Sequence, residues 1–278
     1  MRTIAHLSDL HFGRTDPATL QPLIDVLRKI RPDLVAVSGD LTQRARIAQF
    51  KEAKAFLNSL PSPQIVVPGN HDLPLDNLFL RLFSPLSRFK RYITHDLAPM
   101  HIDDEVAVLG LNTTRRMLVK NGRVNAEQVS GINKHFGNLR GSHTRIVVTH
   151  HPFDLPAGFD DSQLVGRSRM AMNNFAKSGV DIFLAGHLHV AHTGNTERHE
   201  IAGHTALVIQ AGTATSTRGR GELNSFNVIR IQASEVSVEP YSWQLAHQRF
   251  SPSSIKYFRR SAPGTSAVSG LVWQEVRH

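Results

Sequence analysis

The chain contains no cysteine. Disulfide bonds and thiolate metal sites are therefore excluded, although this absence leaves the cellular compartment open. The sequence also lacks an apolar run near the ~20 residues that span a bilayer, and it has no long Lys/Arg run of the kind that marks a nucleic-acid tract. The N-terminus, Met1–Leu7, has the pattern of a strand and lacks the apolar stretch of a signal peptide. We therefore expect a cytoplasmic protein, and peripheral contact with a membrane surface stays open.

Histidine and positive charge are abundant instead. The 278 residues include 16 histidines, and 32 Lys and Arg against 23 Asp and Glu give a net charge of +9. With cysteine absent, imidazole and carboxylate remain as the protein ligands for zinc, manganese or iron. A basic surface attracts anions, including nucleotides, nucleic acid and acidic lipid headgroups. The charge therefore favours an anionic partner, although it is equally typical of a protein that is merely soluble and basic.

The order of the apolar segments indicates an α/β fold. Up to residue 185, short apolar runs alternate with segments of helical periodicity. The expected strands are Ile4–Ser8, Leu34–Ser38, Gln64–Val67, Val106–Leu111, Arg145–Thr149 and Ile182–Ala185. The expected helices are Thr19–Ile30, Ile47–Leu60, Phe79–Phe89, Asn125–Phe136 and Met170–Ser178. This alternation predicts layered sheets and helices.

After residue 200 the pattern changes to short strands with polar connections. Thr205–Gln210, Phe226–Ile231 and Val236–Tyr241 predict a β meander. The sequence shows no internal repeat and no clear interdomain linker. We therefore predict one principal domain over residues 1–245 and a C-terminal tail or lid over residues 246–278 that packs on the same domain.

Five short polar motifs each follow an apolar, strand-like run. They are Asp9-Leu10-His11, Gly39-Asp40, Gly69-Asn70-His71-Asp72, His150-His151-Pro152 and Gly186-His187-Leu188-His189. Ligand sites of α/β sheets gather where strands end and loops begin, so one concave site can collect all five. Each motif alone is explained as well by a turn or by a packed histidine. Their joint occurrence at strand ends makes coincidence a poor explanation.

The ordered set of motifs, which covers residues 9–189, resembles the calcineurin-like metallophosphoesterase superfamily. Within it, the chain looks similar to the bacterial class III cyclic-nucleotide and glycerophosphodiester phosphodiesterases. The resemblance implies a four-layer α/β/β/α sandwich of two mixed β-sheets flanked by helices. It also implies two metal ions, drawn from manganese, iron and zinc, at the edge of the sheets.

Transferred motif by motif, the resemblance implies a ligand set. The ligands of the first metal ion would be Asp9, His11 and His189, those of the second Asn70, His150 and His187, and Asp40 would bridge both ions. A carboxylate suits the bridge because it can use both oxygens. An Asn oxygen adds a ligand without adding charge, which keeps the site electrophilic.

Other residues of the motifs are predicted to act on the substrate. His71 would face the phosphate and donate to a phosphoryl oxygen or to the leaving oxygen, and Asp72 beside it is a candidate to orient its ring. The family pattern places the metal ligand first in the His150-His151 pair, so His151 would lie behind the ligands or face the substrate. Arg218 and Arg220 lie on a glycine-containing loop and are suited to hold a phosphate or carboxylate in bidentate fashion. A solvated hairpin is the alternative for that loop.

These features together predict a dinuclear metal-dependent phosphodiesterase that hydrolyses a small or lipid-like phosphodiester by attack of a metal-bound hydroxide. Two cations about 3.5–4 Å apart offset the charge of such an anion and hold the attacking and leaving oxygens in line. A nuclease, a phosphomonoesterase and a non-catalytic scaffold are the alternatives. Nucleic acid is the less favoured substrate, because no DNA-capping domain is recognisable after residue 200. The oligomeric state stays open.

Overall fold

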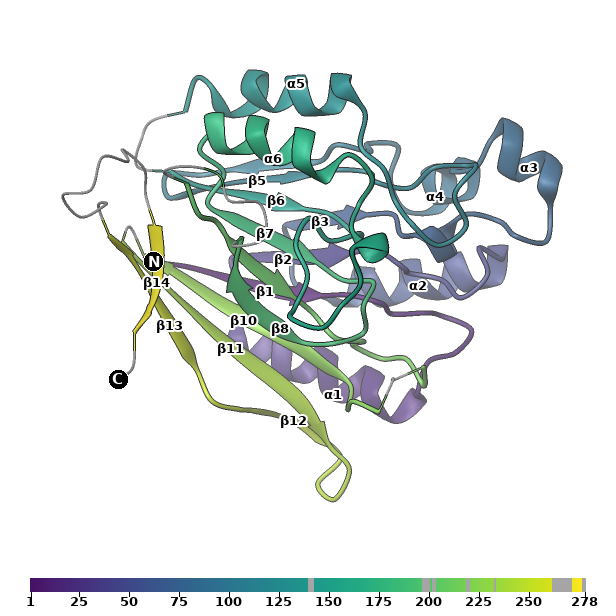
Figure 1. Cartoon of the computed structure of the whole chain (residues 1–278). Helices are drawn as coiled ribbons and strands as arrows, with labels where there is room; N and C mark the ends of the chain where they lie inside the picture. Colours follow the sequence, from purple (N-terminus) through teal and green to yellow (C-terminus); the bar gives the residue numbers. More distant parts are fainter. Residues whose placement is uncertain are drawn as a thin grey trace.

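The computed structural model describes residues 1–139, 143–196, 201, 204–218, 221–232, 234–261 and 272–276. Two β-sheets face each other at the centre of the molecule, and helices cover their outer faces (Figure 1). The larger sheet has the strand order β14-β13-β11-β10-β1-β2-β3, with β12 also paired to β11, and the smaller has the order β4-β5-β6-β7-β9-β8. Both sheets contain parallel and antiparallel pairs. The predicted sandwich of two mixed sheets is therefore confirmed.

The bounds of the elements follow the chain. The larger sheet contains β1 (Arg2–Leu7), β2 (Leu34–Ser38), β3 (Gln64–Val67), β10 (Ser225–Gln232), β11 (Glu235–Gln244), β12 (Arg249–Pro252), β13 (Lys256–Ser261) and β14 (Val272–Val276). The smaller sheet contains β4 (Met100–Ile102), β5 (Val106–Gly110), β6 (Thr144–Val148), β7 (Ile182–Ala185), β8 (His192–Asn195) and β9 (Leu207–Gln210). The helices are α1 (Pro17–Ile30), α2 (Ile47–Ser59), α3 (Leu78–Phe83), α4 (Ser87–Tyr92), α5 (Ala126–Phe136) and α6 (Ser168–Lys177).

Three apolar clusters hold the four layers together. Strand side chains alternate between faces, so Ile4 of β1 points into the cluster between the sheets while Leu7 points toward the helices. The larger sheet packs against α1 and α2, which contribute Leu23 and Phe50. The smaller sheet packs in the same way against α5 and α6, which contribute residues such as Phe175. Because both faces of the central strands are covered, most of the residues in these strands are apolar.

Local sequence signals set the ends of several helices. The carboxylate of Asp16 caps α1 by accepting from the backbone N–H of Ala18, and the proline after Asp16 occupies the first helical turn. Asn125 caps α5, with Gln128 completing a reciprocal capping box. These contacts satisfy backbone donors that a helix end leaves free.

One predicted helix is two helices. The sequence pattern predicts a helix over Phe79–Phe89, but the structure divides this segment into α3 and α4. Pro85 lies between them, and it lacks the backbone N–H that a continuing helix needs. A proline also disfavours the helical conformation of the residue before it. The periodicity therefore correctly predicted helical structure on both sides of Pro85, and the proline interrupts the helix between them.

The C-terminal segment contributes strands to the larger sheet where it is described. β12 and β13 pair with β11, and β14 pairs with β13. Phe258 and Trp273 from these strands are buried in the cluster between the sheets. The guanidinium group of Arg260 lies over the Trp273 ring, 4.9 Å from its centroid, and forms an ion pair with Asp181. This segment thus extends the sheet and covers part of the core.

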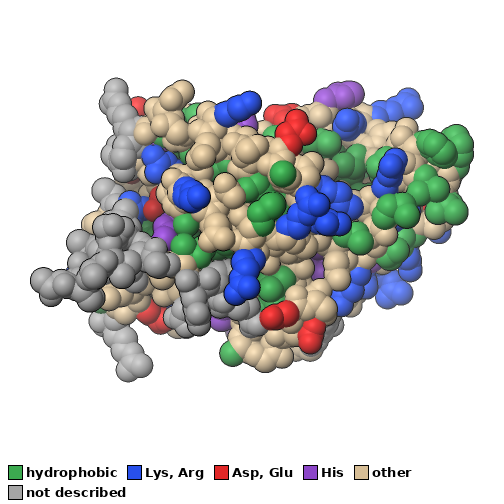
Figure 2. Space-filling model, turned by 45° about the horizontal axis from the view of Figure 1, so that its top comes forward, with side chains coloured by type: hydrophobic (Ala, Val, Ile, Leu, Met, Phe, Trp, Pro, Cys, Tyr) green, Lys and Arg blue, Asp and Glu red, His purple; other side chains and the backbone are tan. Residues whose placement is uncertain are grey.

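Exposed apolar side chains gather at the end of the molecule that carries α3. Figure 2 shows this end as a group of hydrophobic side chains bordered by lysine and arginine. The exposed side chains include Leu78, Phe79, Phe83 and Met117. Among the helices of the described ranges, none combines the length and the apolar character that crossing a bilayer requires.

The parallel strands bring the five motifs to one edge of the sandwich. β1, β2 and β3 are parallel neighbours, and so are β5, β6, β7 and β9. The motifs follow the carboxyl ends of β1, β2, β3, β6 and β7. Carboxyl ends of parallel strands open onto the same edge, which is where α/β proteins place their ligand sites.

Candidate metal centre

The loops after β1, β2 and β7 have an unusual backbone at the motif residues. Left-handed φ angles occur at Asp9 (53°), His11 (50°), Asp40 (51°), His187 (72°) and His189 (61°). Such conformations are uncommon for residues with a side chain, and each costs on the order of 1–3 kcal/mol, so they persist where the surroundings enforce them. Here main-chain bonds join the loops, because the N–H of Asp9 donates to the Gly39 carbonyl and that of His11 to the Asp40 carbonyl. These backbone conformations direct the side chains of the five residues toward the same region.

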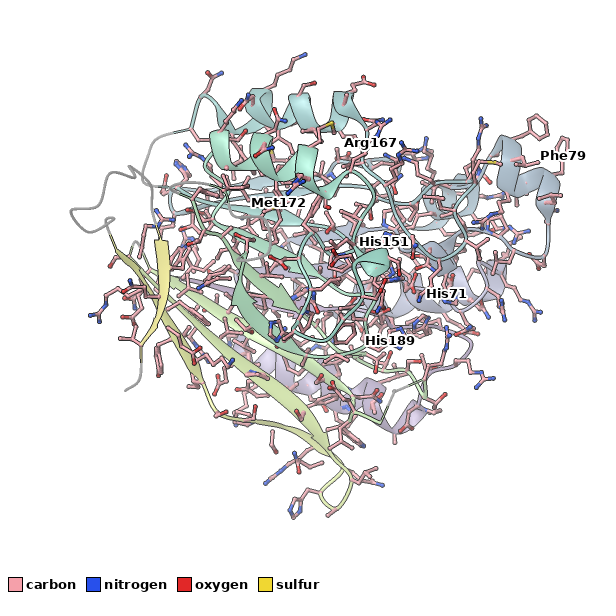
Figure 3. The ribbon with its side chains drawn as sticks, in the orientation of Figure 1. His71, Phe79, His151, Arg167, Met172 and His189 are labelled. Atoms are coloured by element: carbon pink, nitrogen blue, oxygen red, sulfur yellow. The ribbon has the colours of Figure 1, made fainter. Side chains whose placement is uncertain are left out.

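The first group of converging side chains contains Asp9, His11, Asp40 and His189. Asp9 Oδ1 lies 3.5 Å from His11 Nε2 and 3.2 Å from His189 Nε2, and Asp40 Oδ2 lies 3.8 Å from His11 Nε2. All four residues are buried, and each offers one ligand atom within 4.8 Å of the others. Figure 3 labels His71 and His189 in this region.

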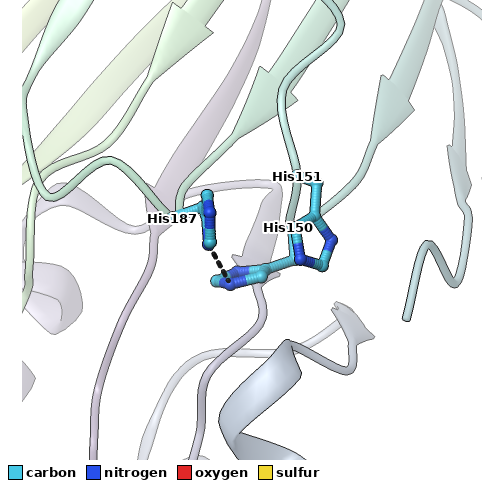
Figure 4. A group of neighbouring side chains, drawn as sticks. All are labelled: His150, His151 and His187. Atoms are coloured by element: carbon cyan, nitrogen blue, oxygen red, sulfur yellow. Dashed lines mark hydrogen bonds between the residues drawn. The ribbon is translucent and has the colours of Figure 1, made fainter. Parts of the chain in front are cut away.

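The second group shares Asp40 with the first. Asp40 Oδ1 lies 3.4 Å from His150 Nε2, which is also 3.1 Å from Asn70 Oδ1 and 3.3 Å from His187 Nδ1. Figure 4 shows the contact between the rings of His150 and His187. The two oxygens of Asp40 therefore face two separate sets of ligand atoms, as a bridging carboxylate requires.

Hydrogen bonds to neighbouring groups fix the orientation of three candidate ligands. His150 Nδ1 contacts the Ser38 carbonyl at 2.8 Å, which leaves Nε2 directed toward Asn70 and Asp40. The amide nitrogen of Asn70 donates to the Val119 carbonyl, which directs its Oδ1 inward. The other Asp9 oxygen, Oδ2, accepts from the Ser8 hydroxyl at 2.6 Å and from the His187 N–H at 3.0 Å. His150, Asn70 and Asp9 thus each present one atom to the centre and use another to hold their orientation.

The donor set fits metal ions better than it fits a hydrogen-bond network. Asp9 Oδ1 is buried and has no hydrogen-bond partner among the described residues. The Nε2 atoms of His11 and His189 face each other at 3.3 Å, so at most one proton can lie between these two lone pairs. Buried acceptors without donors are costly unless a cation satisfies them. Imidazole nitrogen with carboxylate and amide oxygen is a ligand set that accepts zinc, manganese and iron.

The protonation of the group follows from burial and neighbouring charges. Burial opposes ionisation of Asp9, but the charge of His189 and the proximity of the His11 ring outweigh it and hold the pKa of Asp9 well below its ordinary value. Burial also opposes charge on His150, yet Asp40 raises the pKa of His150 to about 9. Burial, and after it the charge of His150, lowers the pKa of His187 to about 3. Without a metal ion, a proton on His150 balances the carboxylates, and a bound cation takes its place.

His71 and Arg218 meet at the mouth of the centre. The His71 ring lies 5.0 Å from the His11 ring, edge to face. Its Nδ1 donates to the Gln43 carbonyl at 2.9 Å, and its Nε2 lies 3.0 Å from Nη1 of Arg218. The Arg218 carbonyl is also 3.3 Å from His189 Nδ1. The structure therefore brings both predicted substrate-facing residues together, whereas Arg220 lies outside the described residues.

The residue that orients the His71 ring is Gln43 rather than Asp72. Asp72 is fully buried, and its carboxylate accepts from the backbone N–H groups of Leu41, Thr42 and Gly69 and from the Thr42 hydroxyl. Burial, and then the charge of Asp40, raise its pKa to about 6. Asp72 thus ties the loop after β2 to the loop after β3. Sequence adjacency suggested the contact with His71, but a carbonyl from a distant loop carries no sequence signal.

His151 lies behind the ligands. Its Nδ1 accepts from the Thr113 hydroxyl at 2.7 Å, and its Nε2 donates to the Lys120 carbonyl at 3.0 Å. The ring is completely buried, and its centroid lies 4.7 Å from that of His187. Of the two roles that the sequence left open, these contacts favour positioning over contact with a substrate. Thr113 was not singled out by the sequence, because an isolated threonine has no distinctive pattern.

Glycines in two motifs allow the loops to approach closely. A Cβ atom at Gly69 would lie 2.1 Å from Asp40 Oδ1, and one at Gly186 would lie 1.8 Å from Ser8 Oγ. Any side chain at either position would displace the groups that hold the metal ligands. The glycines of these motifs are therefore part of the geometry of the centre.

A family comparison agrees with this arrangement. Residues 2–191 match the family described as calcineurin-like phosphoesterase. The chain belongs to the calcineurin-like phosphoesterase family. The match covers every metal-ligand candidate, and the family implies a phosphoester substrate. The resemblance predicted from the five motifs is thus confirmed.

Curated relatives of this metallophosphoesterase are distant. A glycerophosphodiester phosphodiesterase GpdQ of Enterobacter lignolyticus is 38% identical over 82 residues, which are 25% of this chain and 29% of that protein. The 3',5'-cyclic adenosine monophosphate phosphodiesterase CpdA of Escherichia coli K12 is 25% identical over 59% of this chain and 58% of its own length. The chain thus spans well under two thirds of these two relatives.

Solved structures share the fold of this metallophosphoesterase at low identity. A dimetal phosphatase from Danio rerio superposes with a TM-score of 0.62 and 13% identity, covering 86% of this chain and 95% of that chain. The purple acid phosphatase PPD1 from yellow lupin seeds gives a TM-score of 0.67 and 13% identity, covering 91% of this chain and 53% of that chain. Both likenesses support the sandwich architecture.

Proposed function

We propose that this metallophosphoesterase is a phosphodiesterase that hydrolyses a small or lipid-like phosphodiester with the help of two metal ions. The observation that carries the proposal is the position of Asp40, whose two oxygens face two buried ligand groups. The named activities of the relatives, a glycerophosphodiesterase and a cyclic-nucleotide phosphodiesterase, favour a diester over a monoester.

The ligand groups divide between two ions. Asp9, His11 and His189 would hold one, Asn70, His150 and His187 the other, and Asp40 both. When bound, a pair of divalent cations supplies Lewis acidity to the phosphoryl oxygens and lowers the pKa of water. Manganese, iron and zinc all suit these ligands.

Arg218 is placed to bind the phosphate of the substrate. Among the described residues, its guanidinium contacts only the His71 and Gln43 side chains at the mouth of the centre. A planar guanidinium can bind two oxygens of a phosphate at once, which makes it a better partner for the substrate than for a neutral imidazole. We expect Arg218 to exchange its contact with His71 for contacts with the phosphate when substrate enters.

That exchange would free Nε2 of His71 for proton transfer. The Gln43 carbonyl keeps the proton on Nδ1, so Nε2 is the atom that can pick up a proton and pass it to a leaving oxygen. Burial lowers the pKa of His71, so the ring is a readily discharged acid once protonated. Proton transfer of this kind contributes about 10²–10⁴-fold to the rate.

The test is a substrate comparison on metal-reconstituted protein. Metal-free protein is loaded with Mn²⁺, Zn²⁺ or Fe²⁺, the metal content is measured, and turnover is recorded with bis(p-nitrophenyl) phosphate and p-nitrophenyl phosphate. We expect about two ions per chain and faster turnover of the diester. A faster monoester reaction would make the protein a phosphomonoesterase. Two bound ions with no hydrolysis of either would leave a non-catalytic metal protein. His95, an exposed histidine outside the centre, provides the control variant His95→Ala.

A further inference from the structure

Three arginines cluster beside the metal centre, on segments that main-chain hydrogen bonds join. The N–H of Arg123 donates to the Thr113 carbonyl, which places the loop of Arg123 beside that of Arg115. The N–H of Gly166 donates to the Gly122 carbonyl, and the N–H of Val124 to the Gly166 carbonyl, so that Arg123 pairs with the residue before Arg167. The positions of the three arginines are therefore fixed by the backbone of three loops.

The charges of this arginine cluster are not neutralised by the contacts in the described ranges. Arg115 uses its guanidinium to donate to the Asn112 and Thr114 carbonyls and to Gln128 Oε1, all of which are uncharged. The guanidinium groups of Arg123 and Arg167 make no hydrogen bond or ion pair with a described residue, and both side chains are exposed. Burial, and after it the charges of Arg123 and Arg167, lower the pKa of Arg115. Three like charges held this way create a positive field that an anion relieves.

The cluster borders two adjoining cavities. One, of about 490 Å³, is lined by Arg123 and Arg167 together with Asn121, Ser162 and one carboxylate, that of Asp161. The other, of about 360 Å³, is lined by all three arginines and by Arg116, together with Met117 and Val124. The guanidinium of Arg116 donates to the Leu82 carbonyl. Cavities of about 300–1,000 Å³ are typical of small-molecule sites. The adjoining cavities thus offer arginine side chains to an anion, and Met117 and Val124 to an apolar substituent of that anion.

The same loop supports the metal centre from behind. The Lys120 carbonyl accepts from His151 and the Val119 carbonyl accepts from Asn70, while Arg123 lies a few residues further along the chain. A Cβ atom at Gly122 would lie 2.2 Å from Nδ1 of His151. Figure 3 shows Arg167 at the end of α6 that is nearer to His151 in this view, and Figure 2 shows lysine and arginine side chains gathered on this face.

We propose that Arg115, Arg123 and Arg167 form a second anion-binding site, which takes a phosphate group that carries an organic substituent. Its use as a subsite for a second phosphate of the substrate rests on the phosphodiesterase function proposed above, whereas the binding of phosphate itself does not. Arg115 supplies a fixed charge, and the unbonded guanidinium groups of Arg123 and Arg167 supply the donors. The organic group lies against Met117 and Val124, and it is either a nucleoside or a lipid.

Binding is tested on protein freed of metal with a chelating resin, so that no metal ion competes for the anion. Calorimetric titration with inorganic pyrophosphate, adenosine 5'-monophosphate and dihexanoyl phosphatidic acid separates the bare phosphate group from the two organic sources. Each variant removes charge-assisted hydrogen bonds to the anion, so Arg123→Gln and Arg167→Gln should each raise the Kd for pyrophosphate by at least about tenfold. These side chains make no bonds in the described structure, so both variants should fold.

Arg169→Gln is the matched control, because Arg169 is exposed on α6 and lines neither cavity. It removes the same charge and should leave the Kd within about twofold. If the control weakened binding as much as Arg167→Gln, attraction would come from the overall charge and the site would not exist. Unchanged binding in both cluster variants would overturn the proposal as well.

The role as a subsite is tested separately by turnover of the metal-loaded protein. Thymidine 5'-(p-nitrophenyl phosphate) is compared with its derivative that carries a 3'-phosphate. The wild-type chain should favour the 3'-phosphorylated diester by about tenfold in kcat/KM, and Arg123→Gln should lose that preference. Equal turnover of both diesters would refute the subsite. Failure to hydrolyse either diester would refute the phosphodiesterase function instead and leave the pyrophosphate result standing.

Discussion

The metal centre and the arginine cluster are built in opposite ways at neighbouring places. In the metal centre, carboxylates and imidazoles alternate around buried atoms, and left-handed turns at strand ends hold them there. In the arginine cluster, like charges lie at or near the surface on loops that main-chain hydrogen bonds join. The metal centre gathers carboxylates and nitrogen lone pairs, which a bound cation would stabilise. The arginine cluster gathers positive charges, which a bound anion would stabilise. Residues 113–124 contact the metal centre and include two arginines of the cluster. Substitutions can therefore affect either region alone or both regions at once.

The largest effect is expected at the bridge of the metal centre. Asp40→Ala removes the one carboxylate that faces both ligand groups, so both ions should be lost and kcat/KM should fall by at least about 10³-fold. Elemental analysis and diester turnover measure this, with His95→Ala as the control. Pyrophosphate binding at the arginine cluster should persist in Asp40→Ala. Two retained ions would show that Asp40 is not the bridge.

Removal of the proton donor should separate chemistry from metal binding. His71→Ala leaves every candidate ligand in place, so the metal content should stay near that of the wild type while kcat falls about 10²–10⁴-fold. The ratio of kcat to metal content measures this directly. A variant that turns over normally with both ions bound would remove His71 from the mechanism.

Metal affinity should depend on pH with a definite sign. Asp40 raises the pKa of His150 to about 9, so His150 carries a proton at pH 7 in the metal-free chain, and metal binding must release it. Affinity should therefore rise by up to about tenfold per pH unit from pH 7 to 9 and level off above the pKa of His150. Competition titrations with a chelator of known pH dependence measure this. Pyrophosphate affinity at the arginine cluster should change far less over the same range, because arginine stays charged.

The smallest effect is expected at the glycine that the two regions share. Gly122→Ala would place a methyl group against the His151 ring, and such overpacking typically costs about 1–3 kcal/mol. Thermal unfolding should therefore occur at a lower temperature, and metal affinity and pyrophosphate affinity should both decrease.

A glycine in α5 provides the control for this substitution. A Cβ atom at Gly131 would meet no described group within 4 Å outside its own helix backbone and chain neighbours. Gly131→Ala should therefore leave both affinities unchanged and stabilise the helix by about 0.5–1 kcal/mol. If Gly122→Ala behaved like Gly131→Ala, the loop would not couple the two regions.

Sequence patterns alone predicted most of the sandwich. The apolar runs predicted Leu34–Ser38 and Ile182–Ala185 with their observed bounds, because strands buried on both faces are nearly continuous apolar runs. The Phe79–Phe89 segment was misjudged as one helix because periodicity outweighed the proline within it. Strand pairing and the joining of the last strands to the larger sheet depend on contacts between distant segments, which periodicity does not report.

The sequence by itself determined the chemistry that could gather at the sheet edge. Polar motifs directly after buried strands, with histidine abundant and cysteine absent, limit the ligands to imidazole, carboxylate and amide. Tertiary structure alone decided which atoms face the centre, that Gln43 rather than Asp72 orients His71, and that His151 is held by Thr113. Tertiary structure also brings Arg115, Arg123 and Arg167 together, although no sequence motif marks them. The physical reason is that side-chain direction follows from hydrogen bonds between loops far apart in the chain, and a backbone carbonyl or a lone arginine leaves no pattern in the sequence.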